Sequence, residues 1–245
     1  MAAKLRNNLH VHICDRRTLM KLLLVAPTEQ EIIEVWRQRS TVPILQHATL
    51  LITGVGAVAT ACHLMRALRS PVDLVIHAGI CGSFSKSLQL GEVVQVVAER
   101  FGDLGAQHGR AFLDVFDLQL CQANHFPFKR GWLKNPFTPD ALLRRLPQVK
   151  GLTVNLVTGT EATRKLRHEK YQADVESMEG AALFYCCLIE KMPFVSIRSV
   201  SNVVERRRRN GWQVELAIKN LNDWLLSWLT RLSSSPSVQL RSVTR

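Results

Sequence analysis

The sequence predicts an α/β fold in which a central mixed sheet is flanked by helices in three layers. Short apolar runs alternate with amphipathic stretches along the whole chain, which is typical of strands that alternate with helices. Several of these runs lead directly into small or glycine-rich residues, as buried strands do at the ligand-binding edge of an open α/β sheet. With 245 residues, 47% of them hydrophobic, the chain is long enough for one domain with a large core.

The first element predicted is a buried parallel strand at residues 20–26, where the run Met-Lys-Leu-Leu-Leu-Val-Ala is almost entirely apolar. Thr28 and Glu31 then have the spacing of a capping box, which predicts a helix that continues to about Arg39. Glu31 has two interpretations. It either caps that helix or faces a ligand just beyond the carboxyl end of the first strand.

The next two strands are predicted at residues 50–52 and 72–76, and each is followed by small residues. Gly54–Gly56 forms a turn that can approach an anion or a ligand closely. Because this Gly-x-Gly turn lacks a third glycine, it is weak support for dinucleotide binding. The loop predicted at residues 77–84 would let a substrate lie against the backbone, and His77 is expected to be structural because no acid partner is evident nearby.

The middle of the chain is predicted to contain two strands and a long loop. Residues 90–97 have the alternation and β-branching of a strand, and residues 152–159 form another apolar run. Between them, residues 121–139 are rich in turns, aromatic rings and cations. So long a loop is usually functional or interfacial, so it is either a lid over a pocket, in this or a neighbouring subunit, or a dimer interface. Residues 164–170 are predicted to form a solvated helix.

The segment 175–182 is the most distinctive part of the chain, because two acids bracket a serine and a methionine before a Gly-Ala-Ala run. A buried helix is predicted at 183–189, and an acid at its start would gain from the exposed amides and the helix dipole. The alternative is a surface turn with a capping acid. A last strand, predicted at 192–202, would deliver Ser201 and Asn202 to the carboxyl edge of the sheet.

The ends of the chain are predicted to lie outside the folded domain, which is expected to span residues 20–232. Residues 1–19 are expected to be a poorly ordered extension and residues 233–245 a disordered tail. The final helix, 214–232, carries leucines and tryptophans at helical spacing, which indicates core or interface packing. No apolar run is long enough to span a bilayer, and residues 1–19 lack the apolar core of a signal peptide.

The net charge of +12 resembles that of a nucleic-acid-binding protein, but most of it lies in three segments. Residues 1–19 carry +3, Arg206–Arg209 carry +4 and residues 233–245 carry +2, which leaves +3 for the body of the chain. Such a body fits a small anionic substrate as well as a polymer. A basic nucleic-acid-binding protein is therefore the non-enzyme alternative. None of the six cysteines has C-x-x-C spacing, which indicates buried thiols in a reducing cytoplasm, with neither a metal site nor disulfides.

The adjacent Met178 and Glu179 in segment 175–182 resemble the ribose-binding segment of the purine nucleoside phosphorylase and nucleosidase superfamily. The resemblance covers residues 20–232 and implies a three-layer, phosphorylase/hydrolase-like fold. It also implies that Glu179 accepts hydrogen bonds from ribose hydroxyls while Met178 packs against the sugar. A carboxylate suits this role because it can accept two hydroxyl donors at once.

The resemblance assigns further roles along the chain. The glutamate that activates water in nucleosidases corresponds to Glu31, or to Glu29 if the register of the first strand slips. Gly79 and Ile80 lie in the loop against which the substrate is expected to rest. In related nucleosidases the bend after the next strand contacts the base.

Ala162 and Thr163 occupy that bend here, where larger apolar groups are expected. Ser201 and Asn202 occupy the position where many nucleosidases carry Ser-Asp and the acid protonates purine N7. An asparagine cannot act as a general acid. Its amide can instead donate to N7 or O6 of a 6-oxopurine such as hypoxanthine, and so stabilise the departing base.

Three stretches resemble the futalosine hydrolase family in particular: residues 78–84, 101–105 and 201–202. That family hydrolyses the N-glycosidic bond of futalosine in menaquinone biosynthesis. The resemblance implies a nucleoside substrate, a homodimer or higher homo-oligomer, and no metal or organic cofactor. The alternatives are a methylthioadenosine/adenosylhomocysteine nucleosidase and a purine nucleoside phosphorylase. A phosphorylase needs a phosphate cradle, for which Gly54–Gly56 and Arg198 are the candidates.

Overall fold

The structure, a computed structural model, describes residues 20–109, 111–137, 141–205 and 211–234. The predicted extension at residues 1–19 and the basic run Arg206–Arg209 lie outside the described residues. Most of the predicted tail lies outside them as well. Its first two residues, Ser233 and Ser234, belong instead to the last helix.

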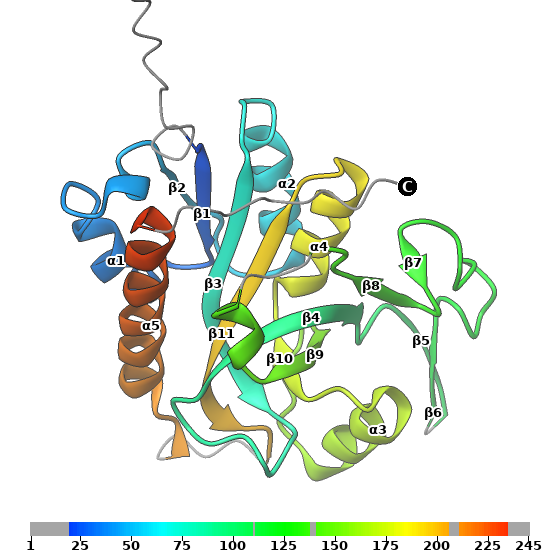
Figure 1. The fold of residues 1–245 in the computed structure, drawn as a ribbon. Helices are drawn as coiled ribbons and strands as arrows, with labels where there is room; N and C mark the ends of the chain where they lie inside the picture. The colour runs from blue at the N-terminus through cyan, green and yellow to red at the C-terminus, as the bar shows by residue number, and fades with distance from the viewer. Residues whose placement is uncertain (1–19, 110, 138–140, 206–210, 235–245) are drawn as a thin grey trace, which may run out of the picture.

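In the described part of the chain, the centre of the fold is a mixed sheet of nine strands, with the order β2-β1-β3-β10-β9-β4-β8-β7 and β11 paired with both β3 and β4 (Figure 1). Five strands therefore form a closed ring of pairings, β3-β10-β9-β4-β11. The pairs within β2, β1, β3 and β11 run parallel, as do β10–β9 and β9–β4, whereas β10–β3, β11–β4, β4–β8 and β8–β7 are antiparallel. The strands of this sheet are β1 (Leu22–Ala26), β2 (Thr49–Ile52), β3 (Leu74–Ser83), β4 (Val93–Phe101), β7 (Phe128–Lys129), β8 (Trp132–Lys134), β9 (Gln148–Thr153), β10 (Val175–Ser177) and β11 (Phe194–Val203).

Helices cover both faces of this sheet, which confirms the predicted three-layer α/β fold. Alternate residues of β1 belong to two different cores, as expected for a strand that is buried on both faces. One core includes α5 (Val214–Ser234), which lies beside α1 (Ile33–Arg37). The other includes α2 (Ala57–Ala67) and α4 (Gly180–Ile189), which pack against each other.

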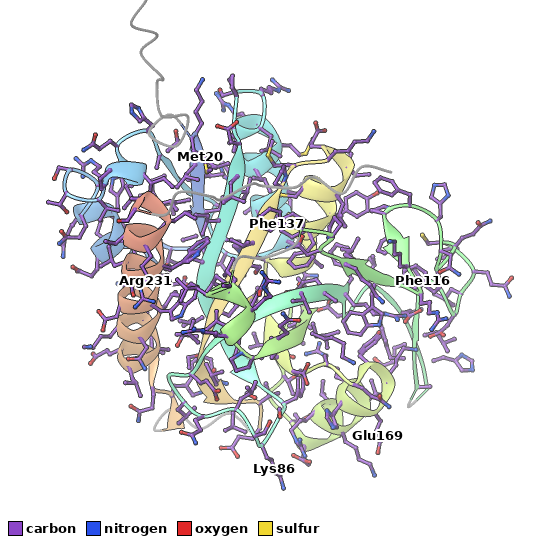
Figure 2. The ribbon with its side chains drawn as sticks, in the orientation of Figure 1. Met20, Lys86, Phe116, Phe137, Glu169 and Arg231 are labelled. Carbon is purple, nitrogen blue, oxygen red and sulfur yellow. The ribbon has the colours of Figure 1, made fainter. Side chains whose placement is uncertain are left out.

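The remaining elements are short. α3 (Glu161–Tyr171) lies beyond the end of β9, and a separate hairpin pairs β5 (Gly105–His108) with β6 (Ala111–Asp114). The described residues also form three 3₁₀ turns, at Glu29–Glu31, Pro43–Leu45 and Leu143–Arg145. In Figure 2, Met20 before β1 and Lys86 after β3 lie at opposite ends of the sheet, so its carboxyl edge is the one toward Lys86. No helix in the described ranges is both long and apolar enough to cross a bilayer.

Several predicted boundaries are wrong, and pairing between distant segments explains why. Residues 77–83, predicted as a loop, continue β3 because β11 pairs with β3 from Val75 to Ser83. The predicted loop 121–139 contains the hairpin of β7 and β8, and the strand predicted at 152–159 is β9, which ends at Thr153. The helix predicted to reach Arg39 is a 3₁₀ turn followed by the short α1.

Candidate active site

Glu31 lies just beyond the carboxyl end of β1 and is only 7% exposed. The hydroxyl of Thr28 donates to Glu31 Oε1 over 2.7 Å, and the backbone N–H of Ile80 donates to Oε2 over 2.9 Å. Thr28 therefore does not form the predicted capping box, because its hydroxyl binds the carboxylate itself. Glu29, the alternative to Glu31, is exposed on the same turn.

Burial raises the pKa of Glu31 above its ordinary value of 4.5, although the hydrogen bond from Thr28 and the charge of Arg198 oppose the shift. The backbone donor of Ile80 also opposes it, whereas the negative charge of Glu179 adds to it. A carboxyl group with a raised pKa is a better proton acceptor near neutral pH than an exposed one. Glu31 therefore has the environment of a general base.

Glu179 is the N-cap residue of α4 and is 5% exposed. Its Oε1 accepts a hydrogen bond of 3.0 Å from the backbone N–H of Gly56, and its Oε2 one of 3.3 Å from Met178. Gly56 has a φ of +98°, a conformation that favours glycine, and this directs its N–H at the carboxylate. The Gly-x-Gly turn therefore does bind an anion, and that anion is the protein's own Glu179.

Arg198 on β11 is completely buried, pairs with Glu179 and acts on Glu31 through its charge. Its Nη2 donates to His77 Nε2 over 2.7 Å and lies 3.8 Å from Glu179 Oε2. A Cβ placed on Gly79 would lie 1.9 Å from Arg198 Nη1 and 2.8 Å from Glu31 Oε2. Glu31 and Arg198 therefore both lie close to Gly79, and only a glycine leaves room for both.

His77 is the acceptor for this arginine, which agrees with its predicted structural role. Burial and the nearby charge of Arg198 hold the pKa of His77 well below its usual 6.5, so the imidazole is neutral. Nε and Nη1 of Arg198 have no hydrogen-bond partner within the described part of the chain. Two donors therefore remain on a buried cation that lies between two carboxylates, and they can bind a polar ligand.

Ser201 and Asn202 lie further along β11, where this strand pairs with β3. The register of β11 shifts between Val200 and Asn202, so that Asn202 pairs with Gly82. Ser201 Oγ lies 3.1 Å from Cys81 O and 2.9 Å from Asn202 Oδ1, and Asn202 Nδ2 donates to the carbonyl of the next residue over 3.1 Å. Gly82 follows Gly79 by three residues, so Asn202 pairs with β3 about 10 Å further along the strand than Gly79, the residue beside Glu31 and Arg198.

Of the other predicted site residues, some lie beside the two glutamates and others lie at the start of α3. Ile80 contacts Glu31 through its N–H, and Met178 is partly buried next to Glu179. Ala162 is exposed at the start of α3, where the backbone of Thr163 donates to the capping side chain of Thr160. No contact within the described residues joins Ala162 or Thr163 to the carboxylates, so their role in binding stays a prediction.

Glu99 on β4 is a buried acid that the sequence reasoning missed. It is 1% exposed, and Thr153 Oγ1 donates to its Oε2 over 2.9 Å. Burial raises the pKa of Glu99 to about 7, against the effects of the Thr153 hydrogen bond and of Arg198, while Glu179 contributes to the rise. The strand predicted at residues 90–97 ends two residues before Glu99, so the sequence prediction did not include this acid. An acid next to a β-branched run nevertheless signals a buried polar contact.

Glu99→Gln is expected to change how stability depends on pH. Because the folded-state pKa of about 7 exceeds the ordinary 4.5, the folded protein binds the proton of Glu99 more tightly than the unfolded chain does. The resulting contribution to the free energy of unfolding is fully present below pH 4.5 and is lost as the pH rises to about 7. The loss reaches at most about 1.4 kcal/mol per pH unit. Urea unfolding between pH 5 and 8 should show Glu99→Gln gaining stability relative to the parent protein as the pH rises.

A matched control for this experiment is Glu190→Gln, which changes an exposed acid at the other end of α4. The control should unfold with the same pH dependence as the parent protein. A constant difference in unfolding free energy between Glu99→Gln and the parent across this range would contradict the raised pKa.

Metal ligation is a separate question, and the geometry of the site does not suggest it. Within residues 20–109, 111–137, 141–205 and 211–234, no three His, Cys, Asp or Glu side chains form a group that could hold a metal ion. The buried acids bind amides, hydroxyls and a guanidinium instead.

The fold and site together define a three-layer α/β protein whose buried carboxylates and arginine converge at the carboxyl edge of the central sheet. Known proteins share this fold. The chain aligns with the structure of a methylthioadenosine/S-adenosylhomocysteine nucleosidase from Neisseria meningitidis, solved with methylthio-immucillin-A, with a TM-score of 0.71 and 17% identity. The alignment covers 86% of this chain and 99% of that one.

Sequence comparison identifies the family. The profile of the phosphorylase superfamily matches residues 39–227. The chain is 33% identical to the futalosine hydrolase of Streptomyces coelicolor over 62% of its own length and 63% of that relative's length. It is 32% identical to the futalosine hydrolase of Thermus thermophilus over 69% of this chain and 75% of that one. The chain belongs to the phosphorylase superfamily.

Proposed function

We propose that the protein is a futalosine hydrolase, which cleaves the N-glycosidic bond of futalosine to release hypoxanthine and dehypoxanthine futalosine. The observation that carries the proposal is that Glu31 and the pair formed by Glu179 and Arg198 lie at one site beside Gly79, while Asn202 pairs with Gly82, three residues or about 10 Å further along β3. This order along the strand suits a ribose at the carboxylates and a purine near the amide. The similarity to two futalosine hydrolases supports the choice of substrate.

The proposed mechanism passes through an oxocarbenium-like ribosyl group. Glu179 accepts the ribose hydroxyls, and Glu31 orients a water molecule, with Nη1 of Arg198 as a donor to its oxygen. The C1′–N bond breaks with its electron pair passing to the purine, the water oxygen bonds to C1′, and a water proton passes to Glu31. The purine anion then takes a proton from solvent and Glu31 returns its proton to solvent, so that hypoxanthine is released and the carboxylate is restored. Each oxygen of Glu31 keeps an acceptor site beside its hydrogen bond to Thr28 or Ile80, so the carboxylate can bind the water without releasing either.

Asn202 is the proposed partner of the departing purine. Its amide nitrogen uses one hydrogen on a backbone carbonyl, and the second hydrogen can donate to the base. Hydrogen bonding to the developing anion then replaces the proton transfer that an aspartate would provide. An amide donor suits a 6-oxopurine, which is the base of futalosine.

Asn202→Asp is expected to shift the preference toward 6-aminopurine nucleosides. A carboxylic acid can protonate N7, whereas a carboxylate repels the O6 acceptor of hypoxanthine. The ratio of kcat/KM for methylthioadenosine to that for futalosine should rise by about tenfold or more, which is the scale of one hydrogen bond to a charged group. Asn202→Ser, which removes the amide without adding a charge, is the control and should lower both rates. An unchanged ratio in Asn202→Asp would show that the base is selected elsewhere.

Hydrolysis is favoured over phosphorolysis because two donors of the proposed phosphate cradle are already engaged within the protein, and of the Arg198 side-chain nitrogens only Nε and Nη1 have no partner among the described residues. The N–H of Gly56 donates to Glu179, and Nη2 of Arg198 donates to His77. A nucleosidase for methylthioadenosine or adenosylhomocysteine remains the second candidate, because the Neisseria enzyme shares the fold. The substrates of the two candidates differ in their purine, which is a 6-aminopurine in methylthioadenosine and a 6-oxopurine in futalosine. Asn202 favours the 6-oxopurine.

One experiment separates these candidates. The protein is incubated with futalosine, methylthioadenosine or inosine, each with and without phosphate, and the products are separated by chromatography. A futalosine hydrolase releases hypoxanthine from futalosine at a rate that does not depend on phosphate. Release of adenine from methylthioadenosine alone would identify the second candidate, and a phosphorylated sugar product would identify a phosphorylase.

We also propose that the protein works in the cytoplasm, in menaquinone biosynthesis, as a homodimer or higher homo-oligomer. The neighbouring helices α2 and α4 present exposed apolar side chains, namely Val58, Met65, Tyr185 and Ile189. An apolar face of this kind commonly marks a protein interface. Sedimentation equilibrium would measure the number of subunits.

A further inference from the structure

The start of α4 is capped by another strand and not by its own N-cap residue. An acidic N-cap side chain ordinarily accepts a hydrogen bond from an amide of the first helical turn. Glu179 holds the N-cap position, yet its carboxylate makes no such bond to the described residues. Its oxygens face Gly56 and Arg198 instead.

The acceptor for this helical turn is Thr153, the last residue of β9. The backbone N–H of Ala181, at the second position of the helix, donates to Thr153 Oγ1 over 2.6 Å. Thr153 is almost fully buried, so water does not compete for this amide. The Thr153 hydroxyl therefore accepts the hydrogen bond from the first helical turn that the carboxylate of Glu179 would otherwise accept.

Glu99 fixes the direction of that hydroxyl. A hydroxyl group has one hydrogen to donate, and that of Thr153 goes to Glu99 Oε2 over 2.9 Å. With its hydrogen held by Glu99, Thr153 keeps an oxygen lone pair toward Ala181. The three groups thus form one chain of hydrogen bonds that ends at the helix beginning with the ribose-binding acid.

The glycines around Glu99 show how closely the backbone approaches this acid. A Cβ on Gly180 would lie 1.8 Å from Glu99 Oε1, and a Cβ on Gly151 would lie 2.3 Å from it. Gly180 is the first residue of α4 and Gly151 belongs to β9. Only glycine at both positions lets the helix start, the strand and the carboxyl group come together.

We propose that Thr153 and Glu99 are positioning residues that cap α4 in place of Glu179, and so leave the Glu179 carboxylate available to grip the ribose hydroxyls. The inference rests on the proposed function, because it assigns the ribose to Glu179. Without the Thr153 hydroxyl, the orphaned amide of Ala181 attracts the Glu179 carboxylate back to its own helix. The sugar then loses an acceptor while the purine contacts remain.

The test compares Thr153→Val, which is similar in shape but lacks the hydroxyl, with Thr153→Ser, which keeps it. Each variant is assayed with futalosine and with 2′-deoxyfutalosine, which has one fewer hydroxyl for Glu179 to bind. Thr153→Val should reduce the preference in kcat/KM for futalosine over its 2′-deoxy analogue by about tenfold, the scale of one hydrogen bond to a charged group. Thr153→Ser should keep the parent preference.

Glu99 is tested in the same way. Glu99→Met removes the acceptor for the Thr153 hydroxyl and should reduce the preference, whereas Glu99→Gln offers an amide oxygen and should keep it. A purely structural role would slow both substrates equally, so the ratio separates positioning from loss of stability. If Thr153→Val does not fold, Thr153→Ala removes the same hydroxyl and is judged by the same ratio.

The outcomes are distinct. A parent protein that cleaves futalosine, together with an unchanged preference in Thr153→Val, overturns the positioning role and leaves the proposed function intact. A reduced preference in Thr153→Ser as large as that in Thr153→Val also overturns it, because the hydroxyl would not be the cause. A parent protein that cleaves neither nucleoside overturns the proposed function and this inference together.

Discussion

Glu31→Gln is expected to lower kcat for futalosine hydrolysis by a factor of about 10²–10⁴, the usual contribution of a general base. The amide oxygen can still accept from the backbone N–H of Ile80, and the Thr28 hydroxyl can turn to accept from the amide NH2, so the fold is kept, but the amide cannot take a proton from water. Single-turnover rates measured by chromatography of released hypoxanthine give the effect. In the parent enzyme, kcat/KM should fall in acid with an apparent pKa above 4.5, because burial raises the pKa of Glu31.

The chain offers a matched control on the same turn. Glu29→Gln changes an exposed acid two residues away and should leave the rate close to that of the parent protein. If Glu29→Gln lost activity and Glu31→Gln kept it, the register of the first strand would have been assigned to the wrong acid.

Glu179→Gln is expected to lower kcat/KM by about 10²-fold, because a side chain with two acceptor oxygens becomes one with a single acceptor and a donor. The variant also removes the carboxylate 3.8 Å from Arg198 Nη2, so the buried guanidinium loses a counter-charge. Both kcat and KM should change, since Glu179 holds the ribose in the ground state and more strongly in the transition state. Steady-state kinetics with futalosine measures both constants.

Glu190→Gln, at the exposed end of α4, is the control for this variant and should behave like the parent protein. Comparing futalosine with 2′-deoxyfutalosine adds a second measurement, because Glu179→Gln should discriminate less between them. Near-parental rates for Glu179→Gln would remove this acid from the site.

Local sequence signals predicted the parts of the site that depend on neighbours in the chain. The apolar run before Thr28 placed Glu31 at the carboxyl end of β1, and small residues after Glu179 predicted a helix that starts there. These signals work because strand burial and helix starts are set by a few consecutive residues. The layers of the fold followed from the same alternation of strands and helices.

Contacts between distant segments could not be predicted in this way. The sequence presents Arg198 only as a candidate phosphate ligand, and nothing near it in the chain shows that its partners are His77 and Glu179. An arginine within an apolar strand does signal a buried charge that requires partners, but not which ones. The same holds for the bond between Thr153 and Ala181, which joins residues 28 positions apart.

The closed ring of β3, β10, β9, β4 and β11 has a consequence for how the site responds to its ligand. A strand with neighbours on both sides cannot slide without breaking two ladders of hydrogen bonds, so Gly79, Arg198 and Thr153 move only as one body. Backbone adaptation to different nucleosides must therefore occur in the segments that leave the ring, whereas the ring itself can change preference only through its side chains, such as Asn202 on β11. Evolution of a new substrate preference in this scaffold would proceed by exchanging loops and single side chains around a backbone that stays the same.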